Sequence, residues 1–305
     1  MDNKYDVIVI GGGPGGYTAA LYAARANLSV LVLEKFSPGG QMATTDIVEN
    51  YPGFAEGING FELGVQMKQG AERFGVKSKL AEVKSVDLNA NPKLVHTRKD
   101  TFEAKTVILA TGAFPRELGL PNEQMLRGRG VSYCATCDGA FFRGKEVAVI
   151  GGGDVALEDA LFLARACSKV YLIHRRDEFR GAKSLQEKVK NTENIEIIWD
   201  TIVEEVTGEE QVTGVSLYNK KKEEHYGLSV QGMFVAVGIQ PNSELFQGQL
   251  EMDEAGYIKA GEDCSSSLSG VFAAGDVRTK QLRQIVTAAA DGANAVTSVE
   301  RYLYQ

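Results

Sequence analysis

Three features of this sequence predict an α/β protein made of two Rossmann-like domains, each of the three-layer ββα type, with the second inserted into the first. A strand-like apolar run followed by a glycine-rich turn occurs near the N-terminus. The same pattern returns near the middle of the chain and aligns with the first copy without a gap. A third strand-and-glycine segment near the C-terminus has no partner in this repeat, which is what an insertion into the first domain would produce.

The composition is that of a globular protein. The chain has 305 residues, of which 44% are hydrophobic and 24% charged, enough for two domains with cores of their own. A net charge of -7 argues against nucleic-acid binding through a basic face. No apolar run approaches the ~20 residues of a membrane span, and Val7–Ile10 is too short for a signal-peptide core. We therefore expect a cytoplasmic protein, in which a C-x-x-C pair is catalytic or metal-binding by default.

The internal repeat predicts the same elements in both domains: a buried strand, a glycine turn, a helix and a second strand. Val7–Gly13 matches Val147–Gly153, and Val30–Leu33 matches Val170–Ile173. Apolar runs of this length, bounded by glycine, are typical of strands in a parallel sheet.

A second, weaker sequence repeat predicts where each domain ends. Ala110-Thr111-Gly112 and Ala236-Val237-Gly238 both follow strand-like runs, and a proline comes three residues after each. The expected first domain is residues 1–114 plus 246–305, and the expected second domain is residues 115–245. Gly270–Asp276 then adds a strand to the first domain, and the apolar spacing over 284–303 predicts a final helix.

The motif Gly11-x-Gly13-x-x-Gly16 predicts a dinucleotide site in the first domain. Its first glycine makes the tight turn, the second lets the backbone approach a pyrophosphate at the helix N-terminus, and the third allows close helix–strand packing. Glu34 ends the following strand, where a carboxylate can accept hydrogen bonds from ribose hydroxyls. This site is therefore not expected to favour a 2′-phosphate.

The second motif, Gly151-x-Gly153-x-x-Ala156, has a different partner. His174 stands where the first copy has Glu34, and Arg175, Arg176 and Arg180 follow it. A cationic cluster at the ribose end is expected where a 2′-phosphate is bound, so this site favours NADPH. Asp154 and Val155 open the next helix, and an acid near a pyrophosphate is unfavourable unless it caps the helix facing away. This pair keeps a different electron donor open.

Cys134-Ala135-Thr136-Cys137 lies between the two glycine motifs. A zinc site would need two more ligands, but Cys167, Cys264 and the three histidines are all isolated in the sequence, so no metal is expected. A redox-active pair needs a thiolate and a group for the accompanying proton. Asp138 directly follows Cys137 and is the candidate for that proton, and Gly139 predicts a turn after it.

Taken together, the motifs resemble the low-molecular-weight (bacterial-type) thioredoxin reductases, class II of the pyridine nucleotide-disulfide oxidoreductase family. The resemblance covers essentially the whole chain. It rests on Gly11–Gly16, Gly39-Gly40-Gln41, Glu49–Gly53, Ala110-Thr111-Gly112, Cys134–Gly139, Gly151–Gly153, His174-Arg175-Arg176 with Arg180, Gly275–Val277 and Arg283-Gln284.

The resemblance implies a flavoprotein enzyme, thioredoxin-disulfide reductase (NADPH), that acts on thioredoxin or a thioredoxin-like protein and forms a homodimer. FAD would bind the first domain and NADPH the second. The implied FAD contacts are Gly11, Gly13, Pro14, Gly15, Gly16, Glu34, Lys35, Gly40, Gln41, Asn50, Ala110, Thr111, Gly112, Gly275, Asp276, Arg283, Gln284 and Ile285. The implied NADPH contacts are Gly151, Gly153, Asp154, Val155, His174, Arg175, Arg176 and Arg180.

The resemblance also implies the roles of the catalytic residues. Cys137 would lie nearer the flavin, Cys134 would attack the disulfide of the partner protein, and Asp138 would supply or accept the proton. In this family one domain turns relative to the other. The crossings between domains are expected near Phe114–Arg116 and Ser243–Phe246.

Several alternatives remain at this stage. The same flavin and disulfide could draw electrons from ferredoxin or another donor, which Asp154-Val155 alone supports. A flavoprotein partner of a peroxidase would carry an N-terminal redox domain, whereas here the first glycine motif begins at Val7. A non-catalytic redox sensor would need neither the nicotinamide site nor the acid beside the cysteines. A flavin-dependent oxidase acting on a small dithiol also stays open, and it would consume oxygen.

Overall fold

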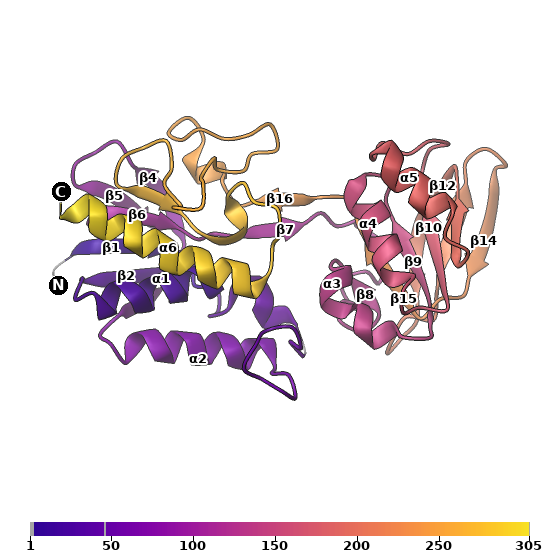
Figure 1. Ribbon diagram of the computed structural model, residues 1–305, viewed down its shortest axis with the longest axis horizontal. Coiled ribbons are helices and arrows are strands. Elements are labelled where there is room, and N and C mark those ends of the chain that lie inside the picture. Colours follow the sequence, from indigo (N-terminus) through magenta and orange to yellow (C-terminus); the bar gives the residue numbers. More distant parts are fainter. Residues whose placement is uncertain (1–2, 46, 305) are drawn as a thin grey trace. The chain divides into compact units, whose positions relative to one another are not determined.

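The computed structural model describes residues 3–45 and 47–304, which form two compact units (Figure 1). Unit 1 comprises residues 1–114 and 240–305, and unit 2 comprises residues 115–239. The two connecting segments, β7 (Ala113–Pro115) and β16 (Ile239–Pro241), pair with each other. Unit 1 resumes at Gln240, whereas the sequence predicted residue 246. Asn242 exchanges hydrogen bonds with Thr111, and the Ser243 hydroxyl donates to the carbonyl of Gly256, which ties this segment to unit 1.

Unit 1 contains one seven-stranded sheet covered by helices. Its parallel part runs β3-β2-β1-β6, β17 also pairs with β6 in parallel, and β5 and β4 continue the sheet in antiparallel fashion. The strands are β1 (Lys4–Ile10), β2 (Val30–Glu34), β3 (Lys77–Leu80), β4 (Val83–Asp87), β5 (Lys93–Thr97), β6 (Thr101–Leu109) and β17 (Val271–Ala273). The helices are α1 (Pro14–Arg25), α2 (Gly60–Glu72) and α6 (Ile285–Leu303), with the short 3₁₀ helices η1 (Gly40–Thr44), η3 (Glu244–Phe246) and η4 (Gly275–Val277).

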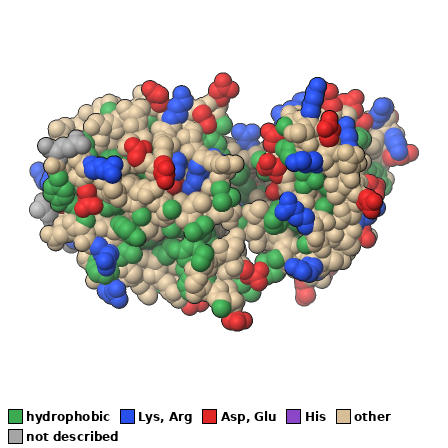
Figure 2. Space-filling view, viewed as in Figure 1, with side chains coloured by type: hydrophobic (Ala, Val, Ile, Leu, Met, Phe, Trp, Pro, Cys, Tyr) green, Lys and Arg blue, Asp and Glu red, His purple; other side chains and the backbone are tan. Residues whose placement is uncertain are grey.

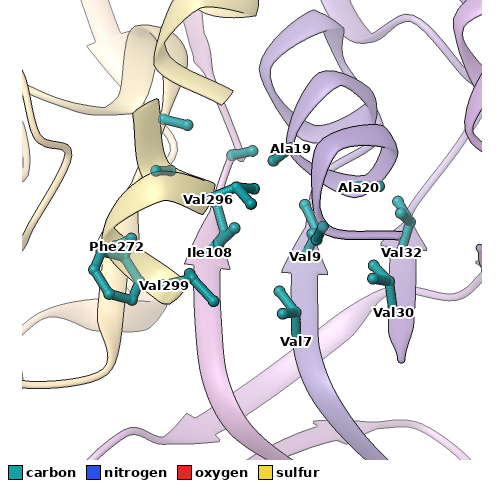
Figure 3. Close-up of a cluster of buried hydrophobic side chains, with 14 of the residues drawn as sticks. Val7, Val9, Ala19, Ala20, Val30, Val32, Ile108, Phe272, Val296 and Val299 are labelled. Carbon is teal, nitrogen blue, oxygen red and sulfur yellow. The ribbon is translucent and has the colours of Figure 1, made fainter. Parts of the chain in front are cut away.

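The core of unit 1 follows from strands that are apolar on both faces, as expected for a buried parallel sheet. On one face, Val7 and Val9 of β1 pack with Ala19 and Ala20 of α1 and with Val296 of α6 (Figure 3). The alternate residues of the same strands pack on the other face against β4, β5 and the segment around Phe246. The strand at 271–273 and the terminal helix predicted from the sequence are both present in this unit.

Unit 2 contains a five-stranded parallel sheet, ordered β11-β10-β9-β15-β8, and a three-stranded antiparallel sheet, β12-β13-β14. The strands are β8 (Val131–Ser132), β9 (Glu146–Ile150), β10 (Lys169–Ile173), β11 (Ile195–Ile198), β12 (Thr201–Thr207), β13 (Gly214–Asn219), β14 (Glu224–Leu228) and β15 (Gly232–Val235). The helices are α3 (Ala135–Asp138), α4 (Asp154–Leu163) and α5 (Lys183–Lys190), with the 3₁₀ helix η2 (Gly139–Phe142). Helices on one face and an antiparallel sheet on the other give the predicted three-layer arrangement.

The predicted internal repeat is confirmed element by element. The order β1-α1-β2 in unit 1 recurs as β9-α4-β10 in unit 2, with the same parallel pairing between its strands. In each unit the N–H of the first glycine of the motif, Gly11 or Gly151, donates to the carbonyl that ends or nearly ends the second strand. The repeat in the sequence therefore encodes two copies of one supersecondary unit.

The surface carries both signs of charge. On the face shown in Figure 2, Lys and Arg side chains are interspersed with Asp and Glu on each unit and do not gather into one basic area. Among the helices within residues 3–45 and 47–304, none combines the length and the apolar character needed to cross a membrane.

The glycine turn of unit 1 gives a stability prediction. In Gly16→Ala the added Cβ would overlap the carbonyl oxygen of Gly11, a backbone atom that cannot move aside. We expect a loss of about 2 kcal/mol or more in the free energy of unfolding, measured in urea. In the matched control Gly70→Ala, within α2, the Cβ meets no atom within 4 Å, and we expect a gain of about 0.5–1 kcal/mol. Equal effects of the two changes would contradict this account of the turn.

Candidate redox-active site

Cys134 and Cys137 form a disulfide in unit 2, with their Cα atoms 5.3 Å apart. Cys134 is the residue before α3, and its carbonyl accepts hydrogen bonds from the N–H groups of Cys137 and Asp138. This helical turn brings the two sulfur atoms to the same side, since residues three apart in a helix are neighbours. Both cysteines are half-buried, so the pair remains within reach of solvent.

Asp138 is tied to the cysteine turn by Ser132, the last residue of β8. The Ser132 hydroxyl donates to the Asp138 carboxylate at 2.6 Å and accepts from the Cys134 N–H at 3.1 Å. Burial raises the pKa of the Asp138 carboxyl above its usual value, while the Ser132 hydrogen bond and the positive charge of Arg127 act in the opposite direction. A half-buried carboxyl with a raised pKa, in the residue that follows a disulfide cysteine, has the properties of an acid–base group.

Gly139 does not form the turn that the sequence predicted. Its φ of -58° is helical, and it joins α3 to η2 without a break. A Cβ at this position would lie 3.1 Å from side-chain atoms of Leu163 and Phe162 in α4. The prediction of a turn was wrong because the glycine is needed for close packing of α3 on α4, a contact that the local sequence does not reveal.

The first glycine motif has the geometry of an anion site. Gly13 precedes α1, and no side chain caps the first turn of this helix. The first turn of a helix presents unpaired N–H groups and a positive partial charge. Glu34 accepts from the N–H of Gly12 at 2.6 Å and from that of Phe36 at 2.9 Å, which fixes its carboxylate beside the turn. The N–H of Gly39 donates to the carbonyl of Gly12, so the loop that carries Gly40 and Gln41 folds back onto the motif.

Two buried polar atoms in unit 1 fit a bound cofactor. Oδ1 of Asp276 and Nε of Arg283 are buried and have no hydrogen-bond partner among the residues that the structure describes. Burial raises the pKa of Asp276, opposed by the positive charges of Lys280 and Arg283. A buried carboxylate left unpaired costs free energy, so a ligand with hydroxyl groups fits this position.

Other residues expected to contact FAD have partners within unit 1. Asn50 donates to the side chain of Gln284 at 3.1 Å, and Gln284 is also the N-cap of α6. Thr111 donates to the carbonyl of Asn242 at 2.6 Å. Lys35 forms an exposed ion pair with Glu82 at 3.0 Å, which leaves its ammonium group on the surface.

The second glycine motif has a similar returning loop in unit 2. The N–H groups of Arg180 and Gly181 donate to the carbonyl of Gly152, at 2.8 and 3.3 Å. Arg180 is thereby fixed beside the turn, and like Arg175 and Arg176 it is exposed. The side chains of these three arginines form no ion pair or hydrogen bond with any described residue. An exposed and uncompensated cationic cluster of this kind fits a phosphate group.

His174 differs from the arginines that follow it. It is buried against the rings of Phe179 and Trp199, and its ring lies where a Cβ on Gly152 would be. Burial lowers the pKa of His174, and the positive charges of Arg180 and Arg175 lower it further. A neutral, buried imidazole packs against the glycine turn at Gly152 and does not present a charge to a ligand.

Asp154 has a partner that accounts for an acid at the start of α4. Its Oδ1 accepts the N–H of Ala182, just before α5, at 2.6 Å. The carboxylate is therefore engaged in fixing the loop that carries Arg180. Val155, next to it, is 49% exposed.

The other two cysteines lie in the hydrophobic cores. Cys167 belongs to the core of unit 2, and Cys264 is fully buried in unit 1. Burial raises the pKa of both thiols, that of Cys264 to about 12, so both are inert as nucleophiles at neutral pH. Within residues 3–45 and 47–304 no group of three or more His, Cys, Asp or Glu side chains is arranged to hold a metal.

Two Rossmann-like units and a C-x-x-C disulfide flanked by a half-buried carboxyl define a disulfide oxidoreductase. Residues 5–292 match the family model for pyridine nucleotide-disulphide oxidoreductases. A thioredoxin reductase of Mycolicibacterium smegmatis is 49% identical over 300 residues, covering 98% of this chain and 96% of the relative. The crystal structure of thioredoxin reductase from Streptococcus pyogenes MGAS5005 matches with a TM-score of 0.95 and 43% identity, covering 100% of this chain and 99% of that one. The chain belongs to the pyridine nucleotide-disulphide oxidoreductases and, within them, to the thioredoxin reductases.

These findings confirm the family and the fold expected from the sequence. FAD and NADPH, the two cofactors expected, are those of this family. Cys134 and Cys137 are joined, as a redox-active pair requires.

Sequence reasoning missed several residues that the structure brings to these sites. Ser132 links Asp138 to the cysteine turn, but a serine at the end of a strand carries no signal in the sequence. Asn242 both donates to and accepts from Thr111, and its only signal was the preceding proline of the Gly-x-x-Pro repeat. Asp291, in α6, accepts a hydrogen bond from the N–H of Gly275. Nothing in the sequence of this helix distinguishes Asp291 from an ordinary helical residue.

The raised pKa of Asp138 predicts how stability depends on pH. The folded state binds this proton more tightly than the unfolded chain, so its contribution to stability is present at low pH and is lost as pH rises through the folded-state pKa. Asp138→Asn removes this titration and can still accept from Ser132. We expect the variant to gain stability over the unaltered protein as pH rises from about 4, near the ordinary pKa of Asp, to neutrality.

Urea unfolding at several pH values measures this effect. The control is Asp177→Asn, an exposed carboxyl in the same unit, for which we expect little change at any pH. A stability difference for Asp138→Asn that stays constant from pH 4 to pH 8 would show that Asp138 titrates normally.

Proposed function

We propose that this chain is an NADPH-dependent FAD flavoenzyme that reduces the disulfide of thioredoxin, or of a thioredoxin-like protein, through Cys134 and Cys137. The observation that carries the proposal is the disulfide turn, whose adjacent Asp138 is half-buried, has a raised pKa and accepts a hydrogen bond from Ser132. Membership of the thioredoxin reductases supports the choice of partner. The proposal includes the homodimer and the cytoplasmic location expected from the sequence.

We assign FAD to unit 1 and NADPH to unit 2. In unit 1 the uncapped start of α1 suits the pyrophosphate, Glu34 suits a ribose, and Asp276 suits a hydroxyl of the ribityl chain. In unit 2 the three exposed arginines suit the 2′-phosphate. His174 then positions the turn rather than touching the phosphate, because its ring is buried beneath Gly152.

The work of the protein's own residues lies in positioning and proton control. When bound, FAD supplies the transfer of electrons from the nicotinamide to the disulfide. Two electrons and two protons convert the Cys134–Cys137 disulfide into two thiols, and we assign one of these protons to Asp138. Its raised pKa lets it hold a proton closer to neutral pH than an ordinary carboxyl does.

Thiol–disulfide exchange completes the reaction. The Cys134 thiolate attacks one sulfur of the thioredoxin disulfide, which forms a mixed disulfide and releases the other thioredoxin sulfur as a thiolate. The Cys137 thiolate then attacks Cys134, which restores the intramolecular disulfide and releases thioredoxin as a dithiol. The protons lost by the two cysteines are taken up by the two thioredoxin sulfurs, so the exchange is balanced.

Two observations favour NADPH over ferredoxin as the electron donor. Asp154, the one sequence feature that supported another donor, is bonded to the N–H of Ala182. Arg175 and Arg176 have no acidic partner among the described residues that would otherwise explain them.

Anaerobic titration with NADPH followed by a turnover assay tests the proposed function. We expect full bleaching of the flavin absorbance to need about two equivalents of NADPH, because the Cys134–Cys137 disulfide takes up one of the two electron pairs. Steady-state reduction of thioredoxin should follow. Cys134→Ser and Cys137→Ser should each abolish thioredoxin reduction while the flavin is still bleached by NADPH. Cys167→Ser, a buried thiol outside the pair, is the control. Bleaching by reduced ferredoxin but not by NADPH would overturn the donor, and absence of turnover with any thioredoxin would favour a sensor.

The arginine cluster predicts the preference for NADPH over NADH. Arg176→Ala removes one charged contact to the 2′-phosphate, each worth about 1.5–3 kcal/mol. We expect the dissociation constant for NADPH to rise roughly tenfold or more, with that for NADH nearly unchanged. Lys188→Ala, an exposed cation on α5, is the matched control. Equal weakening of both nucleotides would place the 2′-phosphate elsewhere.

A further inference from the structure

A buried carboxylate in α6, Asp291, is bound by two cations and by the backbone of the cofactor turn. Its Oδ2 accepts from the N–H of Gly275 at 2.9 Å, from Nε of Arg278 at 2.9 Å and from Nζ of Lys280 at 2.8 Å. Its Oδ1 accepts a second bond from Arg278 at 2.7 Å. All three ionised side chains are nearly inaccessible, with at most 10% of each exposed.

Burying three charges is expensive, and hydrophobic side chains of the same volume would often be at least as stable. The cluster also carries one positive charge more than it needs to neutralise Asp291. This excess acts on Asp276, whose Oδ1 has no hydrogen-bond partner among the described residues. Burial raises the pKa of Asp276, and the positive charge of Lys280 opposes that rise. The surplus charge thus partly offsets the effect of burial and stabilises the ionised form of Asp276, which accepts hydrogen bonds.

Asp291 also fixes the backbone that carries Asp276. Gly275 has a φ of +77°, which side chains rarely adopt, and its N–H points to Asp291. The N–H of Ala274 is held on the other side by the carbonyl of Leu109. The turn at Gly275 is thus held from both sides, by the sheet and by α6.

The same helix turn contacts the first glycine motif. A Cβ on Gly292, the residue after Asp291, would overlap the carbonyl oxygen of Gly15, and a Cβ on Gly15 would lie 3.1 Å from the carbonyl oxygen of Ala288. Asp291 therefore lies where α6, the start of α1 and the Gly275 turn meet. A shift of Asp291 changes the spacing between the two halves of the proposed FAD site.

We propose that Asp291, with Arg278 and Lys280, is a positioning residue that holds the Gly275–Asp276 turn in its FAD-binding form before the cofactor arrives. This inference rests on the proposed binding of FAD to unit 1. Its effect is preorganisation: the polar acceptor is already in place, so less of the binding free energy is spent on ordering the turn.

FAD binding to the apoprotein, measured by quenching of flavin fluorescence, tests this role. Asp291→Asn removes the charge that holds both cations, and Lys280→Met leaves the Arg278–Asp291 pair intact while removing the surplus charge. We expect the FAD dissociation constant to rise about tenfold or more in each variant, which corresponds to about 1.4 kcal/mol or more. The control is Lys93→Met, another buried lysine of unit 1, whose ammonium donates to the carbonyl of Leu88, away from the turn.

A second measurement separates positioning from stability. Urea unfolding of the apoprotein reports any general loss, and hydrogen exchange reports the Gly275 N–H directly. We expect faster exchange of Gly275 in Asp291→Asn, whereas Lys93→Met should lower stability without changing Gly275 exchange or FAD affinity. If Asp291→Asn does not fold, Lys280→Met decides. Wild-type FAD affinity in a folded variant would overturn the proposal, whereas failure of the unaltered apoprotein to bind FAD would overturn the proposed function itself.

Discussion

The close approach of a helix to a glycine turn is the constraint on which both units depend. In unit 1, α1 begins so near β1 that a side chain on Gly16 would overlap the carbonyl of Gly11, and in unit 2 a Cβ on Gly151 would lie 2.6 Å from that of Ala156. This packing aims the first turn of each helix at the space above the motif. In both units a later loop then donates hydrogen bonds to the carbonyl of the middle glycine, Gly12 or Gly152. The same backbone arrangement therefore occurs in both units, and the residues of the returning loops differ between them.

The partial burial of Asp138 beside the disulfide costs stability but gives its carboxyl a raised pKa. Asp138 is half-buried beside the disulfide, which disfavours its charged form, and a single hydroxyl from Ser132 offsets part of that cost. A carboxyl in bulk water is almost entirely ionised at neutral pH and holds no proton to donate, so burial, which raises the pKa, suits Asp138 to this role. Enzymes commonly lose stability at groups used in catalysis, which is the role that we propose for Asp138.

Charge is used differently at the two nucleotide sites. In unit 2 the three arginines are exposed and their side chains have no ion-pair partner among the residues that the structure describes, which suits the phosphate contact that we propose. In unit 1 the side chains of Arg278 and Lys280 are buried and paired with Asp291, which fits the supporting role that we propose for them. The same residue types therefore serve as ligand contacts when exposed and as supports when buried.

The sequence by itself determined the repeated strand–turn–helix units, the identity of the redox pair and the cationic character of the second site, because these depend on local patterns and spacing. It predicted the return to unit 1 at residue 246 rather than Gln240, and it predicted a turn at Gly139, because both depend on tertiary contacts. Asn242 exchanges hydrogen bonds with Thr111 of unit 1, and the absence of a side chain on Gly139 allows the close approach of α4. Only the tertiary structure shows that Asp154 accepts a hydrogen bond from Ala182 and that the ring of His174 is buried against Gly152. It alone also shows the hydrogen bonds from Ser132 to Asp138 and from Gly275 to Asp291. Each of these is a contact that a side chain makes with the backbone or with another side chain. The partner in each contact depends on the tertiary fold. No periodicity or motif records such contacts.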